Sequence, residues 1–404
     1  MNPLPIIWAS LRKYRGSAIA FMLLIAAGTS LSVAIISQER ALRTGSARAA
    51  DRFDLVVAAP GSRTDALLTS VFLRPGAVRL LAPEVTSRLL NDDNAAFVSP
   101  LAFGDSLQGA PVVGVTAPLV SHLSNGLAEG RLFERRNEAV VGSASPLRIG
   151  ETFRPSHGVH EAEDHGDAHD EHAIDLVVVG RMKPTGSPWD RAIVIPVELV
   201  WEMHGLPSGH PKGSAAIGAP FDPALTPGIP AAVVHAKTIA AAYRLRQAYT
   251  GDESMAFFPA EVLIQLYDVV GDIRELMSVL AVITQALVLI AILASVLILL
   301  RLLMPQFVTL RALGAPRRYI FAAAWGFMAT LVASGVAVGL AGGYFLSFGI
   351  SLYLSQKTGI ALAPALGETE FSIGLAILAT GLLLSIVPAA LLLRRPLHEA
   401  IAQY

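Results

Sequence analysis

The sequence contains no cysteine, and only 16% of its 404 residues are charged, against about a quarter in a typical soluble protein. The first absence excludes disulfides, thiolate metal sites and cysteine nucleophiles. The low charge content indicates a membrane protein, because a water-exposed surface needs more ionised side chains. The formal net charge of -1 argues against nucleic-acid binding, which favours a strong basic excess.

A phosphate-binding loop is also missing from the sequence. The chain has no G-x-x-x-x-G-K-[ST] motif and no Gly-Lys pair anywhere, so it cannot build that nucleotide cradle. It has no H-E-x-x-H motif, and no Ser-His-Asp arrangement or paired-carboxylate motif stands out. We therefore expect a non-catalytic chain, with no catalytic residue of its own, whose energy comes from another polypeptide.

Four uncharged apolar runs are present instead, at about 17–36, 278–300, 320–348 and 371–393. Each is long enough to cross the hydrocarbon core of a bilayer, which takes roughly 20 helical residues. The first run is longer than the apolar region of a secretory signal, so we expect a retained span rather than a cleaved leader. The three later runs hold no ionisable residue deep inside, which argues against an ion channel or a proton-coupled transporter.

The positions of the basic residues predict the orientation of these spans, because Lys and Arg concentrate on cytoplasmic loops. They precede the first span (Arg12, Lys13, Arg15), lie between the second and third (Arg311, Arg317, Arg318), and follow the fourth (Arg394, Arg395). Both termini are therefore expected inside, and the long region between the first two spans outside.

The resulting fold class is a membrane protein with four transmembrane helices, one plus three, and a large extracytoplasmic α+β domain with stalk helices. The expected order is a cytoplasmic N-terminus (1–16), span one (17–37), a periplasmic core domain with its stalk (38–275), span two (276–303), a cytoplasmic coupling segment (304–319), span three (320–347), an extracytoplasmic loop (348–370), span four (371–393) and a cytoplasmic C-terminus (394–404).

The outer region mixes short β-branched runs with polar, Gly- and Pro-rich connections, which is typical of an α+β domain. Strands are expected at Phe53–Ala59, Pro111–Thr116, Glu138–Gly142, Ile174–Gly180, Arg191–Pro196 and Ala231–Lys237. Helices are expected at about 64–73, 197–204, 238–249 and 260–277.

An apolar stripe with spacings of 4, 3, 4, 3 and 4 ends this region, formed by Val262, Leu266, Val269, Ile273, Leu276 and Leu280. Such spacing places all six side chains on one helix face. It predicts a stalk helix that continues into the second span and packs on another helix, with 35–50 as the natural partner. The alternative is an ordinary amphipathic helix on the core of the outer domain.

Several short motifs, in order, resemble the FtsX-like permeases, the branch of ABC transporters that includes MacB and LolC/LolE. They are Glu129-Gly130-Arg131, Glu138-Ala139-Val140-Val141-Gly142, Leu147-Arg148-Ile149-Gly150-Glu151-Thr152, Arg311-Ala312-Leu313-Gly314-Ala315 with Arg317 and Arg318, and Arg395-Pro396-Leu397 with Glu399-Ala400. Each motif alone is weak, but their order within a one-plus-three topology is fairly specific. Glu151 stands where the family more often has Asp.

The resemblance implies a permease subunit of the inner membrane, multi-pass, with a MacB-like periplasmic core domain. It implies a dimer, most simply a homodimer, served by cytoplasmic ABC ATPases that bind ATP on its behalf. ATP-driven motion of the periplasmic domain, or mechanotransmission, would then serve export or periplasmic handling of a substrate, with a periplasmic or outer-membrane protein as a further partner. The alternative is a signalling permease that switches a periplasmic partner, for example a cell-wall hydrolase, without transport.

The resemblance also implies an ATPase-coupling element, formed here by Arg311, Leu313, Gly314, Arg317 and Arg318. A second candidate site is a histidine-rich loop containing His157, His160, His165, His169 and His172 among many carboxylates. Imidazole and carboxylate groups suit Zn²⁺, so Zn²⁺ is the candidate ion there, and a solvated insertion between two strands is the alternative.

Two further segments have a structural and a functional interpretation. Residues Pro184-Thr185-Gly186-Ser187-Pro188-Trp189-Asp190-Arg191 resemble a phrase of an FtsX-like subgroup linked to metals; they form either a contact for an outer partner or a rigid turn with Trp189 in the core. Gly335, Gly339 and Gly343 allow close helix packing in span three, either within the chain or at a dimer seam.

Overall fold

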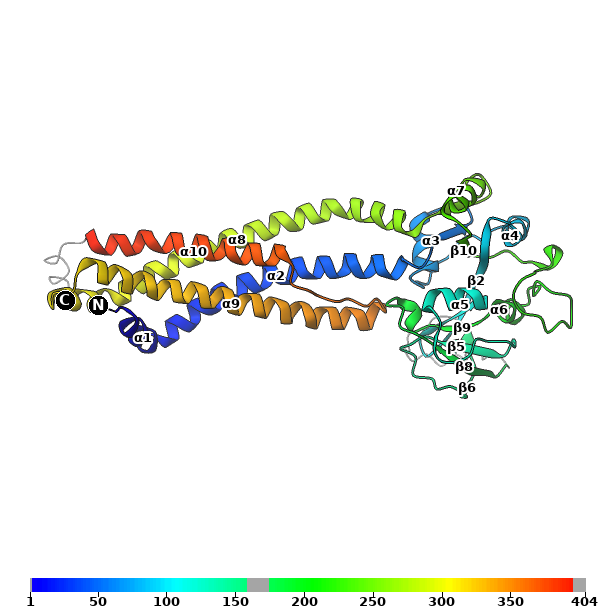
Figure 1. Ribbon diagram of the computed structural model, residues 1–404, viewed down its shortest axis with the longest axis horizontal. Coiled ribbons are helices and arrows are strands. Elements are labelled where there is room, and N and C mark those ends of the chain that lie inside the picture. The colour runs from blue at the N-terminus through cyan, green and yellow to red at the C-terminus, as the bar shows by residue number, and fades with distance from the viewer. Residues whose placement is uncertain (1, 158–173, 395–404) are drawn as a thin grey trace. The chain divides into compact units, whose positions relative to one another are not determined.

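The computed structural model describes residues 2–157 and 174–394 (Figure 1), with some side chains of the long helix α8 and the end of α10 left undescribed. The chain divides into two compact units. The helical unit comprises Met1–Leu42, Gly271–Tyr353 and Leu362–Tyr404. The mixed unit comprises Arg43–Val270 together with Leu354–Ala361, so a short stretch of the expected loop 348–370 belongs to the mixed unit.

The helical unit draws on five helices: α1 (Leu4–Lys13), α2 (Arg15–Ala50), α8 (Pro259–Ala312), α9 (Arg317–Thr358) and α10 (Glu368–Arg394). In the described residues, three segments are long and apolar enough to cross a membrane: Arg15–Ala50, Arg317–Thr358 and Glu368–Ile386. The expected second span lies inside α8, whose described apolar stretch, Val282–Ala294, is shorter. The membrane class is thus supported, while the count of four spans stays a prediction.

Helices α2 and α9 approach closely along a row of three glycines. A Cβ atom added at Gly335 would lie 2.8 Å from a carbon of Ile25, and one added at Gly339 would lie 2.5 Å from Thr29. At Gly343 the nearest atom, on Val33, would be 2.6 Å away. The backbones can meet at this distance only because these positions carry no side chain. The structure therefore places all three glycines against α2 of the same chain.

An additional helix, α1, occupies the N-terminal segment that the sequence assigned simply to the cytoplasm. Ile7 and Ser10 of α1 are buried, and a Cβ atom at Gly326 of α9 would touch Ile7 at 2.7 Å. Trp8 on the opposite side is 71% exposed, and Arg12 and Lys13 lie in the last turn. An exposed aromatic beside basic residues is typical of a helix that lies in a membrane interface.

The mixed unit is built on one sheet whose order along the main path is β11-β1-β10-β2-β3-β9-β5-β8-β4, with β6 on β8 and β7 on β2. The strands are β1 (Leu55–Ala58), β2 (Ala95–Leu107), β3 (Ala110–Val115), β4 (Leu127–Gly130), β5 (Glu138–Val141), β6 (Thr152–Phe153), β7 (Ser156–His157), β8 (Leu176–Met182), β9 (Ile193–Pro196), β10 (Ala231–Ala236) and β11 (Met255–Phe257). Strand β2 joins the two halves, because its first part pairs with β10 and its last part with β3.

A hydrophobic cluster covers each face of this sheet. Along β1, Val56 and Ala58 belong to one cluster, whereas Leu55 and Val57 belong to the other, as the alternation of a strand requires. The helices are α3 (Arg63–Ser70), α4 (Pro83–Leu90), α5 (Ala117–Ser124), α6 (Val197–Met203) and α7 (Ile239–Ala248). Side chains of α3 and α5 enter the first cluster, and side chains of α4, α6 and α7 enter the second. This is an α+β domain.

The stalk stripe is only partly described. Helix α8 runs without a break from Pro259 to Ala312, as a stalk that continues into the second span would require. Val262 is buried in the first cluster and Leu266 is half-buried. The side chains of Val269, Ile273, Leu276 and Leu280 lie outside the described ones, so the packing partner of the stalk stays a prediction.

Candidate functional site

The turn between α8 and α9 holds the residues expected to meet the ATPase. The backbone N–H of Gly314 donates to the carbonyl of Arg311 at 3.1 Å, and that of Ala315 donates to Leu310 at 3.0 Å. Gly314 has a φ of 88°. These two bonds and the left-handed glycine form a Schellman motif, the tight helix ending that glycine makes at low strain. These backbone bonds therefore set the shape of the turn.

Apolar contacts hold the base of this turn and leave its tip exposed. Phe307 and Ile320 are buried on either side, at 6% and 3% exposure, and Leu310 and Ala315 pack against the same cluster. Leu313 at the tip is 80% exposed. The turn thus presents a large aliphatic side chain on a fixed base.

Three arginines flank that tip in the sequence, Arg311 before it and Arg317 and Arg318 after it. Arg317 and Arg318 are exposed, and Arg311 is half-buried. An exposed apolar side chain with arginines nearby in the sequence suits a hydrophobic socket with an acidic rim on a soluble partner, because apolar anchors supply affinity and rim charges steer the encounter.

The histidine-rich loop lies almost wholly outside the described residues. His157 is in β7, paired with Asp105 of β2. His160, His165, His169 and His172 fall within 158–173, which the structure does not describe. Zn²⁺ binding by this loop stays a prediction.

The turn at Pro184–Arg191 is organised by one carboxylate. Asp190 accepts hydrogen bonds from the backbone N–H of Thr185 at 2.7 Å, from the Thr185 hydroxyl at 2.9 Å and from the N–H of Gly186 at 2.8 Å. Trp189 is 1% exposed, and its indole N–H donates to the carbonyl of Val71 at 3.1 Å. The rigid turn with Trp189 in the core is the arrangement that the structure shows.

The same turn has a binding partner within the mixed unit. The backbone N–H of Ala361 donates to the carbonyl of Gly186 at 3.1 Å. A Cβ atom at Gly359 would lie 2.9 Å from the backbone of Pro188, and its φ of 73° also favours glycine. The segment that follows α9 is thus docked on this turn.

The motifs at Glu129–Arg131 and Glu138–Gly142 are joined by a forked ion pair. Arg131 donates to both carboxylate oxygens of Glu138, at 2.7 and 2.6 Å, and Glu138 also accepts from the backbone N–H groups of Glu134 and Arg135. The hydrogen bonds from Arg131 lower the pKa of Glu138 to about 2. The two motifs on which the family resemblance was based therefore close the loop between them through this ion pair.

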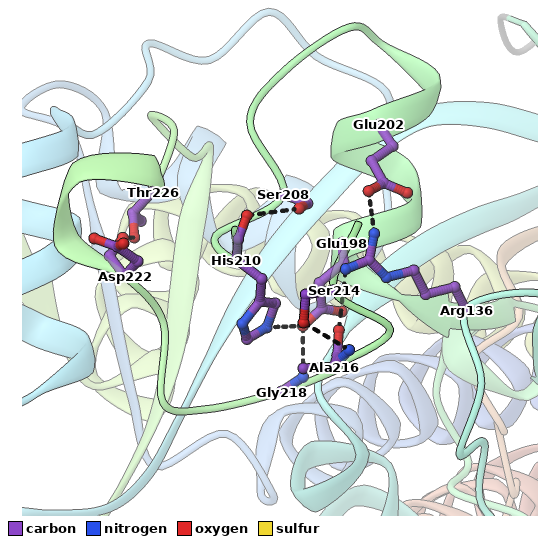
Figure 2. Close-up of polar contacts among 10 residues, drawn as sticks. All are labelled: Arg136, Glu198, Glu202, Ser208, His210, Ser214, Ala216, Gly218, Asp222 and Thr226. Carbon is purple, nitrogen blue, oxygen red and sulfur yellow. Dashed lines mark hydrogen bonds and ion pairs between the residues drawn. The ribbon is translucent and has the colours of Figure 1, made fainter. Parts of the chain in front are cut away.

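A second buried carboxylate holds the long connection after α6 (Figure 2). Glu198 accepts from the N–H of Gly218 at 2.5 Å and lies 3.5 Å from Nε2 of His210. Burial raises the pKa of Glu198. Nearby, Arg136 contacts the carboxylate of Glu202 and donates to the carbonyl of Ala216 at 3.2 Å.

These contacts anchor the connection and do not assemble a nucleophile. Figure 2 shows the hydroxyl of Ser208 directed at the backbone carbonyl of His210, at 3.5 Å, rather than at its ring. Asp222 caps the short helix η2 (Pro223–Leu225) through the N–H of Ala224. The cluster is best explained as the attachment of 205–226 to α6.

Comparison with known proteins found a matching family model and similar solved structures. Residues 278–398 match the family model of the FtsX-like permease C-terminal domain, a region that includes the turn between α8 and α9 and the three glycines. The periplasmic region of MacB from Actinobacillus actinomycetemcomitans is similar in structure at a TM-score of 0.32 and 10% identity, covering 55% of this chain and 95% of that one. No curated protein matches the sequence.

The family match confirms the resemblance inferred from the motifs, over the segment that contains Arg311 to Arg318. Over residues 278–398, the chain is therefore similar to the C-terminal domain of FtsX-like permeases.

Proposed function

We propose that this subunit couples ATP hydrolysis by a separate cytoplasmic ATPase to motion of its periplasmic domain, for export or periplasmic handling of a substrate. The chain is a multi-pass inner-membrane protein in this proposal and works as a dimer of permeases with their ATPases. The ATPase has to lie outside these 404 residues, because they contain no P-loop. A metal-linked role is part of the same proposal.

The observation that carries the proposal is the turn between α8 and α9, which we call the coupling turn (Arg311–Arg318). The Schellman ending of α8 holds the turn in one shape, and Leu313 projects from it at 80% exposure, shortly before the exposed Arg317 and Arg318 in the sequence. A membrane protein gains nothing in stability from an exposed leucine on a cytoplasmic turn. Insertion of Leu313 into a socket on an ATPase would explain its exposure. Movement of the ATPase would then be transmitted through the turn to α8 and α9.

The test is co-purification of the native ATPase with the full-length permease carrying Leu313→Asp. An aspartate in an apolar socket should weaken the complex by about 2 kcal/mol or more, the size of an interface hot spot, which is a loss of more than about tenfold. The ATPase in the pull-down is identified by mass spectrometry, and its ATP turnover is measured with and without the permease.

The matched control is Leu206→Asp, because Leu206 is also exposed, at 42%, but lies in the mixed unit. We expect this variant to retain the ATPase. A Leu313→Asp protein that inserts normally, keeps the ATPase and stimulates it as the parent does would refute the proposal.

A further inference from the structure

A cluster of two histidines and one aspartate, far apart in sequence, meets where the neighbouring strands β1 and β10 begin and end. Asp54 directly precedes β1, and the pairing of Leu55 with Val234 brings it beside His235 of β10. His122 comes from α5, whose side chains pack on the same face of the sheet as that of Val233 in β10. The register of two strands and the position of one helix therefore create the cluster.

The geometry of this cluster is that of a metal-ligand set. One ligand atom from each of Asp54, His122 and His235 lies within 4.8 Å of the other two. Nδ1 of His235 contacts a carboxylate oxygen of Asp54, and the two imidazole rings have centroids 4.4 Å apart. The side chains of His235 and Asp54 are 38% and 35% exposed, so an ion can reach them from solvent.

Neighbouring groups fix the orientation of the two imidazoles. Nε2 of His122 lies 3.0 Å from the carbonyl oxygen of Arg52, and the Arg52 guanidinium donates to the carbonyl of His122 at 3.1 Å. The ring of Phe97 stacks on His235 at 5.3 Å and meets His122 edge-on at 5.5 Å. Contacts of this kind, a carbonyl on an imidazole nitrogen and an apolar wall, position the ligands of metal sites.

We propose that Asp54, His122 and His235 bind one divalent transition-metal ion, with Zn²⁺ as the best chemical fit. Two imidazoles and a carboxylate are the ligands of many three-residue Zn²⁺ sites, which keep a fourth position for water or a ligand. An Asp–His pair alone would account for Asp54 and His235. It would not account for a second imidazole held against the first.

Binding requires only small movements of these side chains. Ligands about 2.0–2.2 Å from Zn²⁺ stand apart by more than the direct Asp54–His235 contact, so the ion would replace that contact with two bonds. Without a thiolate, the site should exchange its ion more readily than a structural zinc site.

The position of the site suggests what a bound ion would do to the structure. Arg52 and Asp54 lie directly after the end of α2 at Ala50, and both are tied to α5 or β10 by the contacts above. A bound ion would cross-link this exit of α2 to two elements of the sheet domain. This inference does not rest on the proposed function, since the cluster belongs wholly to the mixed unit.

The test measures Zn²⁺ bound to the full-length protein in detergent, purified with a tag that contains no histidine. Because the histidine-rich loop would also bind Zn²⁺, the background is a variant with His157, His160, His165, His169 and His172 all changed to asparagine. In that background we expect one equivalent by elemental analysis after dialysis, and a Co²⁺ absorption spectrum typical of four-coordinate nitrogen and oxygen ligation. Asp54→Ala, His122→Ala or His235→Ala should each lower the affinity by more than about tenfold, at least the loss that follows removal of an outer-shell partner.

Two controls separate ligand loss from misfolding. Asp54→Asn keeps the size of the side chain and should also lose affinity, because the amide is a poorer ligand. His204→Gln removes a histidine outside the cluster and should leave binding unchanged. Absence of bound Zn²⁺ in the background protein, or unchanged binding in a folded Asp54→Asn variant, would overturn the assignment.

Discussion

Two tight turns among the described residues are stabilised in opposite ways. The turn after α8 is closed by backbone bonds at Gly314 and Ala315 and leaves Leu313 exposed. The turn at Pro184–Arg191 is closed by the side chain of Asp190 and buries Trp189. The second already has its partner, the segment at Gly359–Ala361 of the same chain. The first leaves its apolar residue exposed, which is the arrangement that we expect of a surface that binds another protein.

The largest expected effect comes from emptying the buried turn. Trp189→Ala should destabilise the mixed unit by about 3–5 kcal/mol, because it leaves a cavity and a carbonyl at Val71 without its donor. Hydrogen exchange at β1 and α3 should accelerate in the intact protein. Trp8→Ala is the matched control, since Trp8 is 71% exposed, and equal protection in the two variants would contradict the buried role of Trp189.

A smaller effect, and one that depends on pH, is expected where a carboxylate closes a loop. The pKa of Glu138 falls from 4.5 to about 2 on folding, through its bonds to Arg131, so the folded state favours the ionised form. This contribution is fully present above pH 4.5 and is lost as the pH falls from 4.5 through 2. We expect the loop at Glu134–Glu138 to lose exchange protection in that range, and the Schellman turn to keep its own.

Glu138→Gln should remove most of this acid sensitivity and cost about 1–3 kcal/mol near neutral pH, as for a buried charged hydrogen bond. Glu134→Gln is the control, because its side chain is 76% exposed. A Glu138→Gln protein with the pH profile of the parent would show that the ion pair does not hold the loop.

The smallest effect on stability is expected at the exposed turn. Gly314→Ala should cost about 1 kcal/mol, all of it from the backbone, since a Cβ atom there meets no other atom within 4 Å. The substitution should nevertheless shift the position of Leu313, and it should therefore lower the stimulation of the ATPase by the permease. Gly150→Ala carries the same backbone strain at a φ of 86° with equally open space, and should leave ATP turnover unchanged; equal loss in both would remove the special role of the turn.

The sequence predicted the elements that carry strong local signals. The β-branched runs became β1, β3, β5, β8, β9 and β10, and the helices α3, α6, α7 and α8 lie where the patterns placed them. Strand β2 was not predicted, because its sequence contains Pro100, Gly104 and Asp105, and these residue types are depleted from strands. Neighbouring strands overrule that preference, since β10 and β3 pair with both halves of β2.

The sites divide in the same way. The turn between α8 and α9 is one continuous segment, so its charges and its glycine could be recognised in the sequence, while its role in ATPase coupling stays a prediction. The cluster of Asp54, His122 and His235 has no sequence signature. Its members are brought together only by the register of β1 with β10 and by the packing position of α5. The pairing of Arg131 with Glu138 was visible as two motifs, but their contact was not.

The Schellman ending of α8 has a consequence for how such a protein can diverge. Apart from Gly314, the shape of the turn does not depend on the side chains at its tip. Ala312, Leu313 and the exposed arginines can therefore be substituted without altering that shape. Duplicated copies of a permease could thereby acquire separate ATPases by exchanging a few tip residues. Fidelity of pairing among sister transporters in one membrane would then be decided by the surface of a turn rather than by its fold.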